Sequence, residues 1–231
     1  MKTNNYMGQY FQIEGIDGAG KTGLIDWLKK VLPQDKYIFV REPGGDVFSE
    51  WCRAYLKSNA ELPIEVQLGL VWSARLSLFE TTIWPAVLTG KVVISDRGDA
   101  STYVYQDLDG KHIEKLPQHL SNRSKAYFKL DQIDVMAIVP TYMFLDVSAE
   151  NSAIRLSQDK KRVVDHFDSS SLQVVQDRIA RYAAYEKKVA PPKNPVAFWK
   201  SFDANQEAKV VNSQALDFLR NTKISLLRFE S

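Results

Sequence analysis

The sequence predicts an α/β fold of three layers, in which a five-stranded parallel sheet carries helices on both of its faces. Strand-like and helix-like patterns alternate along the chain, the order that repeated strand–helix–strand units produce. Residues 91–95 form an almost continuous apolar run, as expected of a strand buried on both faces. The length of 231 residues suits one α/β domain, so we expect residues 1–231 to form a single domain.

Each element is placed by its hydrophobic period and by the turn residues around it. A helix should begin at Lys21, because Leu24, Leu28 and Val31 recur at the helical period. Strands are expected at residues 11–14, 37–40, 91–95, 141–147 and 196–202. Further helices are expected at residues 47–56, 63–88, 101–106, 148–158, 172–188 and 206–219, with a break just before Pro85.

Composition excludes several classes of protein. Lysine plus arginine (30) nearly balances aspartate plus glutamate (28), which argues against a protein that coats nucleic acid or a membrane surface. The single cysteine, Cys52, allows no intrachain disulfide, and a buried small hydrophobe is its simplest interpretation. The N-terminal residues lack a hydrophobic signal core, and no apolar run approaches the roughly 20 residues that span a bilayer. We therefore expect a cytoplasmic protein.

The strongest motif runs from Gly15 to Thr22 and matches G-x-x-x-x-G-K-[ST] between a predicted strand and a predicted helix. Glycines let such a loop curl so that backbone N–H groups point at phosphate oxygens, and the following helix N-terminus adds positive potential. Lys21 would reach the β- and γ-phosphates of a nucleoside triphosphate, and the Thr22 hydroxyl would bind Mg²⁺. The predicted phosphate-binding residues are Gly15, Gly18, Ala19, Gly20, Lys21, Thr22 and Gly23.

Several further motifs occur in a fixed order along the chain. The segment 11–22 reads FQIEGIDGAGKT and the segment 40–45 reads VREPGG. Ser95-Asp-Arg97 is followed by Ser101, Thr102, Tyr105 and Gln106, and FLDV at 144–147 and DAN at 203–205 come later. Together they resemble the thymidylate kinase family over residues 11–219. The resemblance implies phosphorylation of dTMP to dTDP with ATP and Mg²⁺, and it places Ala204 near adenine.

The reaction that this resemblance implies requires little covalent chemistry from the protein. A phosphate monoester acceptor is already anionic at neutral pH, so no side chain has to remove a proton from it. Catalysis is then positioning plus neutralisation of charge on two nucleotides that repel each other. The site should contain many cations and Mg²⁺. The histidines fit no metal spacing, and we interpret them as structural or surface residues: His112, His119 and His166.

Arginines are expected to bind the acceptor phosphate. Arg97 ends the third predicted strand, at the edge where open α/β sheets bind ligands, and Arg53 is a weaker candidate. Arg75 shares a helix face with Val71 and Trp72, so that face can present an apolar contact to a base and a cation to its phosphate. A solvated helix arginine is the alternative interpretation of Arg75.

The family resemblance implies further roles on the acceptor side. Tyr105 would crowd the sugar 2′ carbon and Thr102 would contact the base, although both residues could simply pack. Asp17 is the acid of the phosphate loop, near the acceptor sugar or the metal, and Asp96 would be a partner of Mg²⁺. Glu42 would lie near the same site, with a structural pairing to Arg41 as the alternative.

A lid is expected at about residues 157–171. Arg155 and Arg162 would close over the β- and γ-phosphates and would act like an arginine finger supplied by the same chain. The alternative for the run at 160–162 is a solvated charged segment. The predicted catalytic residues are Asp17, Lys21, Arg97, Arg155 and Arg162.

The chain also departs from the family pattern. Val71 stands where the family usually has an aromatic residue that stacks on thymine, so Trp72 would take over the stacking or the base pocket differs. Gly98 follows Arg97 where the family has an aromatic residue or histidine, which would widen the pocket. These departures indicate a divergent member, of the kind that viruses carry, and allow a different or modified deoxynucleotide.

Three other functions remain open. A deoxynucleoside kinase would need a general base, for which Glu42 is the candidate. A kinase of a modified pyrimidine and an inactive nucleotide-binding protein are the others. The family resemblance also implies a homodimer formed through helices near residues 63–88, with no nucleic acid or membrane as a partner.

Overall fold

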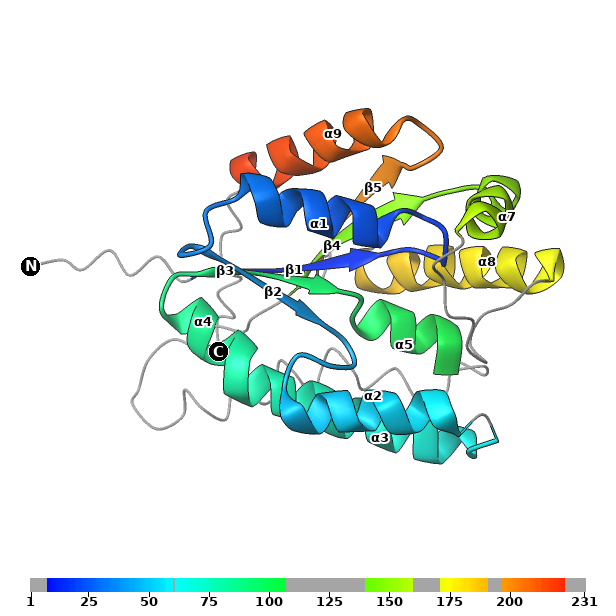
Figure 1. Cartoon of the computed structure of the whole chain (residues 1–231), viewed down its shortest axis with the longest axis horizontal. Coiled ribbons are helices and arrows are strands. Elements are labelled where there is room, and N and C mark those ends of the chain that lie inside the picture. Colours follow the sequence, from blue (N-terminus) through cyan, green and yellow to red (C-terminus); the bar gives the residue numbers. More distant parts are fainter. Residues whose placement is uncertain (1–7, 60, 107–139, 160–170, 191–196, 223–231) are drawn as a thin grey trace, which may run out of the picture.

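The computed structural model describes residues 8–59, 61–106, 140–159, 171–190 and 197–222. Within them, five parallel strands form one sheet in the order β2-β3-β1-β4-β5 (Figure 1). The strands are β1 (Gln9–Glu14), β2 (Tyr37–Arg41), β3 (Val92–Asp96), β4 (Thr141–Asp146) and β5 (Phe198–Asp203). The predicted parallel sheet is confirmed, with each strand within two residues of its expected start.

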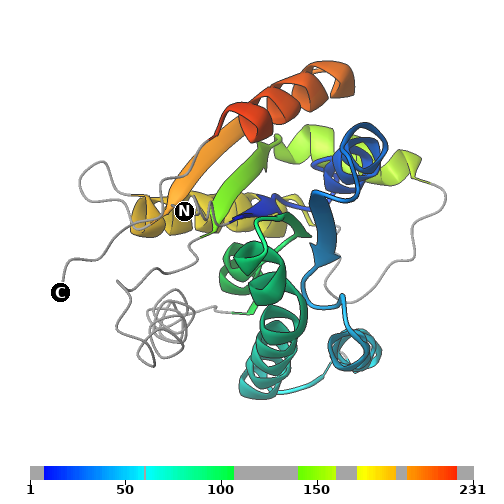
Figure 2. The same cartoon turned by 90° about the vertical axis from the view of Figure 1, so that its left-hand side faces the viewer.

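Helices cover both faces of this sheet, so the predicted three-layer arrangement is confirmed. Figure 2 shows α1 and α9 on one face, and α4, α5 and α8 on the other. Helix α2 packs on α3, away from the sheet. The helices are α1 (Lys21–Val31), α2 (Val47–Ser58), α3 (Ile64–Leu78), α4 (Trp84–Leu88), α5 (Asp99–Gln106), α7 (Ala149–Gln158), α8 (Leu172–Val189) and α9 (Ala208–Asn221).

The long helical pattern before Pro85 is interrupted as predicted. A π-helical segment, η1 (Phe79–Ile83), separates α3 from α4, and Pro85 lies in the first turn of α4. Proline has no N–H and its ring displaces the carbonyl of the preceding turn, so the regular hydrogen-bond ladder cannot pass through it.

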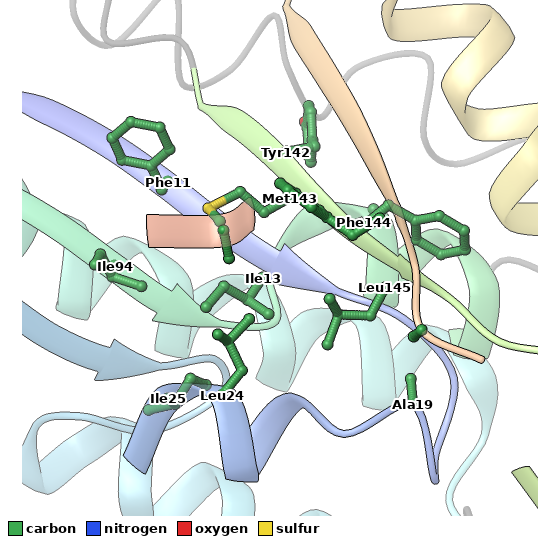
Figure 3. Packing of buried hydrophobic residues seen from close by; sticks show 14 of the residues in the cluster. Phe11, Ile13, Ala19, Leu24, Ile25, Ile94, Tyr142, Met143, Phe144 and Leu145 are labelled. Atoms are coloured by element: carbon green, nitrogen blue, oxygen red, sulfur yellow. The ribbon is translucent and has the colours of Figure 1, made fainter. Parts of the chain in front are cut away.

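The central strand β1 has one apolar face and one polar face, and both are buried. Ile13 points toward Leu24 of α1 (Figure 3), and Phe11 makes an edge-to-face contact with Phe218 of α9, with ring centroids 6.3 Å apart. Because strand side chains alternate, the residues at 10, 12 and 14 share the opposite face. Tyr10, Gln12 and Glu14 are 2%, 0% and 0% exposed, so β1 carries a buried polar stripe.

Parallel strands bring all their carboxyl ends to one edge of the sheet, where the predicted site residues follow the strands. Helix α1 begins there, directly after Gly20, whose φ of 96° favours glycine. Cys52 is fully buried, as expected. None of the described helices is long and apolar enough to cross a membrane. The three histidines and Arg162 lie outside the described residues.

Candidate active site

A cavity of about 580 Å³ opens at the carboxyl edge of the sheet. That size is ordinary for a small-molecule site. It is bounded by the phosphate loop, by the residues that follow β2 and β3, and by side chains of α2, α3, α5 and α7. The predicted residues that line it are Asp17, Gly18, Gly20, Lys21, Thr22, Gly23, Glu42, Arg53, Val71, Asp96, Arg97, Thr102, Tyr105 and Arg155.

The phosphate loop holds its lysine close to the backbone. Lys21 Nζ donates to the carbonyl oxygens of Gly15 and Ile16, each at 2.8 Å. Burial, aided by the positive charge of Arg97, lowers the pKa of Lys21 to about 8. A phosphate that entered the loop would offset this desolvation, so the arrangement suits an anionic ligand.

Asp17 connects the phosphate loop to the acceptor side of the cavity. Its carboxylate accepts from Arg97 NH2 at 2.5 Å and from the Tyr105 hydroxyl at 3.0 Å. Arg178 NH1 lies 3.8 Å away. Burial disfavours the charged form of Asp17, but the charges of Arg97 and Lys21 outweigh burial and lower its pKa to about 2. Asp17 is therefore ionised at neutral pH and orients two cavity-lining side chains.

Arg97 has a left-handed backbone, with a φ of 68°. A residue with a Cβ adopts this conformation at a cost of about 1–2 kcal/mol, so its surroundings must hold it. Arg97 N–H donates to the carbonyl of Ile13 at 3.0 Å, and Ser95 Oγ donates to the carbonyl of Arg97 at 2.7 Å. The side chain then reaches Asp17 and Ser101 across the cavity.

Arg75 is buried beside the cavity wall, which corrects one interpretation of this residue. It is 2% exposed, so it is not a solvated helix arginine. Its Nε donates to Glu42 Oε2 at 2.6 Å and its NH2 to Thr102 Oγ1 at 2.8 Å. The third nitrogen, NH1, makes no hydrogen bond to a described residue, and the role of Arg75 in binding the acceptor stays a prediction.

The alternative pairing of Glu42 with Arg41 is also wrong. Arg41 pairs instead with Glu50, at 2.5 Å and largely in solvent. Adjacent strand residues point to opposite faces, so Glu42 turns inward to Arg75 and Tyr10 while Arg41 turns outward.

Of the two candidates for contact with the base, Val71 lines the cavity and Trp72 does not. Trp72 packs against the core, with its ring 5.5 Å from the Arg75 guanidinium. One position along a helix turns a side chain by about 100°, so the neighbour of Val71 cannot share its direction. Stacking of Trp72 on the base stays a prediction from the sequence.

Arg155 of α7 joins the loop to the far side of the cavity. Its NH1 donates to the carbonyl of Gly18 at 3.3 Å and its NH2 to the carbonyl of Ala204 at 2.6 Å. Ala204 is buried after β5, so the structure brings together two residues that were predicted separately, Arg155 and Ala204. Gly15 and Ala19 of the phosphate loop are buried.

Thr22 and Asp96 fit a hard cation. Both line the cavity, and Asp96 Oδ1 is a buried carboxylate oxygen that makes no hydrogen bond to a described residue. The described residues contain no cluster of three side chains that would enclose a metal by themselves. Mg²⁺ prefers such a site, with one or two protein oxygens and the remaining ligands from phosphates and water.

Sequence reasoning missed Glu14, a buried residue that holds Ser101 of the cavity wall in place. Glu14 accepts from Ser101 N–H at 3.2 Å and from Ser101 Oγ at 2.6 Å, and Tyr182 donates to it at 3.1 Å. Burial raises the pKa of Glu14 to about 7, against the hydrogen bond from Ser101. The available signal was the polar alternation of Tyr10, Gln12 and Glu14 around the predicted strand at residues 11–14.

Comparison with known proteins identifies the family. A family model described as thymidylate kinase matches residues 13–191. The chain is 34% identical over 194 residues to a thymidylate kinase of Mycoplasma mobile, which covers 79% of this chain and 84% of that protein. It is 31% identical over 225 residues to a thymidylate kinase of Prochlorococcus marinus, over 93% of this chain and 96% of that one.

The chain belongs to the thymidylate kinase family. The resemblance seen in the ordered motifs is therefore confirmed, and with it the expectation of a phosphotransferase of the nucleoside monophosphate kinase class. Gly98, which stands where the family has an aromatic residue or histidine, does not leave an empty space. A Cβ at Gly98 would lie only 2.2 Å from Gln12 Cδ, so Gln12 already occupies that position. A viral source stays an untested prediction.

Proposed function

We propose that this member of the thymidylate kinase family transfers the γ-phosphoryl group of ATP to dTMP, giving ADP and dTDP. One observation carries the proposal: a single cavity contains the phosphate-loop lysine and an acceptor-side arginine, connected by Asp17. Arg97 lies 2.5 Å from Asp17, which is two residues after the first glycine of the loop. That arrangement suits two anionic ligands that meet end to end.

The transfer is an in-line displacement at the γ-phosphorus. An oxygen of the acceptor phosphate forms a bond to this phosphorus, while the bond to the bridging β–γ oxygen breaks and its electron pair stays on ADP. Lys21 and Arg155 would neutralise the β- and γ-phosphates, and Arg97, Arg75 and Arg53 the acceptor phosphate. Arg162 joins this set as a proposal from the sequence alone.

The remaining roles follow from the positions of the side chains. Tyr105 is held against Asp17, where it would limit the space at the sugar 2′ carbon. Val71 and Thr102 would contact the base. Mg²⁺, held by Thr22 and Asp96, would supply charge neutralisation at the phosphates. We also infer one domain over residues 1–231, a lid at about 157–171 and, from the single cysteine, a cytoplasmic location.

A deoxynucleoside kinase is less well supported by the contacts of Glu42. A hydroxyl acceptor needs a general base with a free carboxylate oxygen. One oxygen of Glu42 accepts from Arg75 Nε at 2.6 Å and the other accepts from the Tyr10 hydroxyl. Glu42 is thereby committed to a structural contact, and an anionic acceptor needs no such base.

We further propose a homodimer that uses the α2–α3 side of the molecule. Phe48, Trp51 and Tyr55 are stacked along α2 and are 45%, 56% and 40% exposed. An exposed aromatic stripe of this kind commonly marks an interface. Trp51→Glu should halve the mass measured by light scattering, whereas an unchanged mass would place the contact elsewhere.

The function is tested by ADP formation from ATP and Mg²⁺ with a panel of acceptors: dTMP, dUMP, dCMP, dGMP, dAMP, UMP, thymidine and deoxycytidine. We expect the fastest turnover with dTMP, and much slower turnover with UMP and thymidine. Turnover of nucleosides alone would overturn the proposal and would return Glu42 to the role of general base. Binding of ATP without turnover of any acceptor would indicate a nucleotide-binding protein.

A further inference from the structure

Gly98 lies in the cavity wall against a buried side chain from the central strand. A Cβ at this position would meet Gln12 Cδ at 2.2 Å, Oε1 at 2.3 Å and Nε2 at 2.4 Å. Three nearly equal distances mean that the flat face of the amide lies against the Gly98 backbone. The φ of Gly98 is not positive, so space rather than backbone conformation requires glycine here.

The orientation of the Gln12 amide follows from its neighbours. Tyr10 has one hydroxyl proton, which it donates to Glu42 Oε1. Burial, with the nearby charge of Glu42, raises the pKa of Tyr10, so that proton is retained. The hydroxyl can then only accept from Gln12, whose Nε2 lies 3.0 Å away. The other end of the amide, Gln12 Oε1, makes no hydrogen bond to a described residue.

The amide is the first member of a buried hydrogen-bonded chain that ends in the cavity wall. From Tyr10 the chain passes to Glu42, whose Oε2 accepts from Arg75 Nε at 2.6 Å. Arg75 NH2 then donates to Thr102 Oγ1 at 2.8 Å. Glu42 and Thr102 both line the cavity, so a displacement of Gln12 changes two wall residues without touching a ligand.

A merely space-filling residue would not need an amide. A buried amide without a hydrogen bond is costly, and an aliphatic side chain would fill the same gap without that cost. Gln12 is 0% exposed at the centre of the sheet and still carries the donor that Tyr10 requires. The polarity of this side chain therefore serves the chain to Glu42 and Arg75.

We propose that Gln12 is a positioning residue of the acceptor site and that position 98 lacks a side chain in order to receive it. The amide sets the direction of the Tyr10 proton, which fixes Glu42, Arg75 and Thr102 in turn. The inference rests on the proposed function, because the ligand beside Glu42 and Thr102 is taken to be the acceptor nucleotide.

The test is a double-mutant cycle of Gly98→Ala and Gln12→Ala, with KM for dTMP and KM for ATP measured separately. Gly98→Ala should raise KM for dTMP about tenfold and KM for ATP less than about threefold, since contacting residues couple strongly. Gln12→Ala should itself raise KM for dTMP, because the amide is lost. The double variant should be no worse than Gln12→Ala alone, because removal of the amide makes room for the new methyl group. Tyr10→Phe keeps the ring and should raise KM for dTMP by about the same factor as Gln12→Ala.

Gly69→Ala is the matched control, because a Cβ at Gly69 would meet nothing within 4 Å. It should leave both KM values unchanged. Should Gly98→Ala fail to fold, a folded and active double variant would itself support the pairing. Wild-type KM values in Gly98→Ala, equal increases in both KM values, or a double variant whose loss is the product of the two single losses would overturn it. If the wild-type protein were inactive on dTMP, the proposed function would be overturned instead. The coupling of Gln12 and Gly98 would then still be measured from the melting temperatures of the same four proteins.

Discussion

The phosphate-loop side and the acceptor side of the cavity are built in different ways. The first comes from one contiguous segment, residues 15–23, whose backbone and lysine form the site. The second brings together side chains of β1, α3 and α5 with the residues that follow β2 and β3, and it depends on buried contacts such as Glu42–Arg75. A contiguous motif can be recognised in a sequence, whereas a site assembled from distant segments depends on long-range packing. The predictions below test this contrast.

The largest expected effect is on the phosphate-loop side. Lys21→Ala should lower kcat/KM for ATP by about 10³-fold, because a positioned cation at the transferring phosphate is lost. Melting temperature should change little, since the buried ammonium is itself costly. Lys30→Ala, an exposed lysine on the same helix, is the control for the loss of one charge. Equal activity of the two variants would contradict the assignment of the loop.

On the acceptor side, the Glu42–Arg75 pair should dominate stability. Glu42→Gln should cost about 3–5 kcal/mol of unfolding free energy, because it leaves Arg75 as a buried charge without its counterion. The exposed pair of Arg41 and Glu50 is the comparison, and Glu50→Gln should cost less than about 1 kcal/mol. Denaturant titrations measure both values. Similar costs would show that burial of the first pair does not matter.

Two substitutions of Arg97 should separate the chemical role of its side chain from the strain of its backbone. Arg97→Ala and Arg97→Gly should both lower kcat/KM for dTMP, by about 10²-fold. Glycine adopts the left-handed conformation without the Cβ penalty, so the Gly variant should be more stable than the Ala variant by about 1 kcal/mol. Steady-state kinetics and thermal melting measure the two effects. An Ala variant as stable as the Gly variant would contradict the strain at this position.

Activity should fall at alkaline pH because Lys21 loses its proton. Its pKa is lowered to about 8, so the charged form predominates below that pH. We expect kcat/KM for ATP to decline as pH rises through about 8, toward a tenfold loss per pH unit. Bound phosphate favours the ammonium, so kcat at saturating ATP should decline only at higher pH. Identical profiles for kcat and kcat/KM would rule out this origin.

The smallest effect concerns Glu14 and the pH dependence of stability. Its pKa is raised from 4.5 to about 7, so the folded protein binds more protons than the unfolded chain between these values. The contribution of Glu14 to the free energy of unfolding is therefore fully present below about pH 4.5 and is lost as pH rises through about 7. Relative to Glu14→Gln, the wild type should lose about 1–3 kcal/mol between pH 5 and pH 8. A pH-independent difference would contradict the shift.

Sequence patterns predicted most of the fold and the phosphate loop. Hydrophobic periods located all five strands, and Pro85 located the break that the structure forms at Phe79–Ile83. On the acceptor side the family resemblance named Arg97, Thr102 and Tyr105, and all three line the cavity. Sequence patterns did not reveal that Arg75 faces inward to Glu42, because the direction of a helical side chain depends on what packs against it.

Two kinds of information therefore determine this protein. The sequence by itself determined the alternation of elements, the phosphate loop and the family, since these depend on local periodicity and on contiguous residues. Only the tertiary structure decided that Gln12 fills the space beside Gly98 and that Glu42 joins Tyr10 to Arg75. These contacts join residues that are far apart in the chain, and burial, which makes each contact strong, exists only once the sheet and helices have packed.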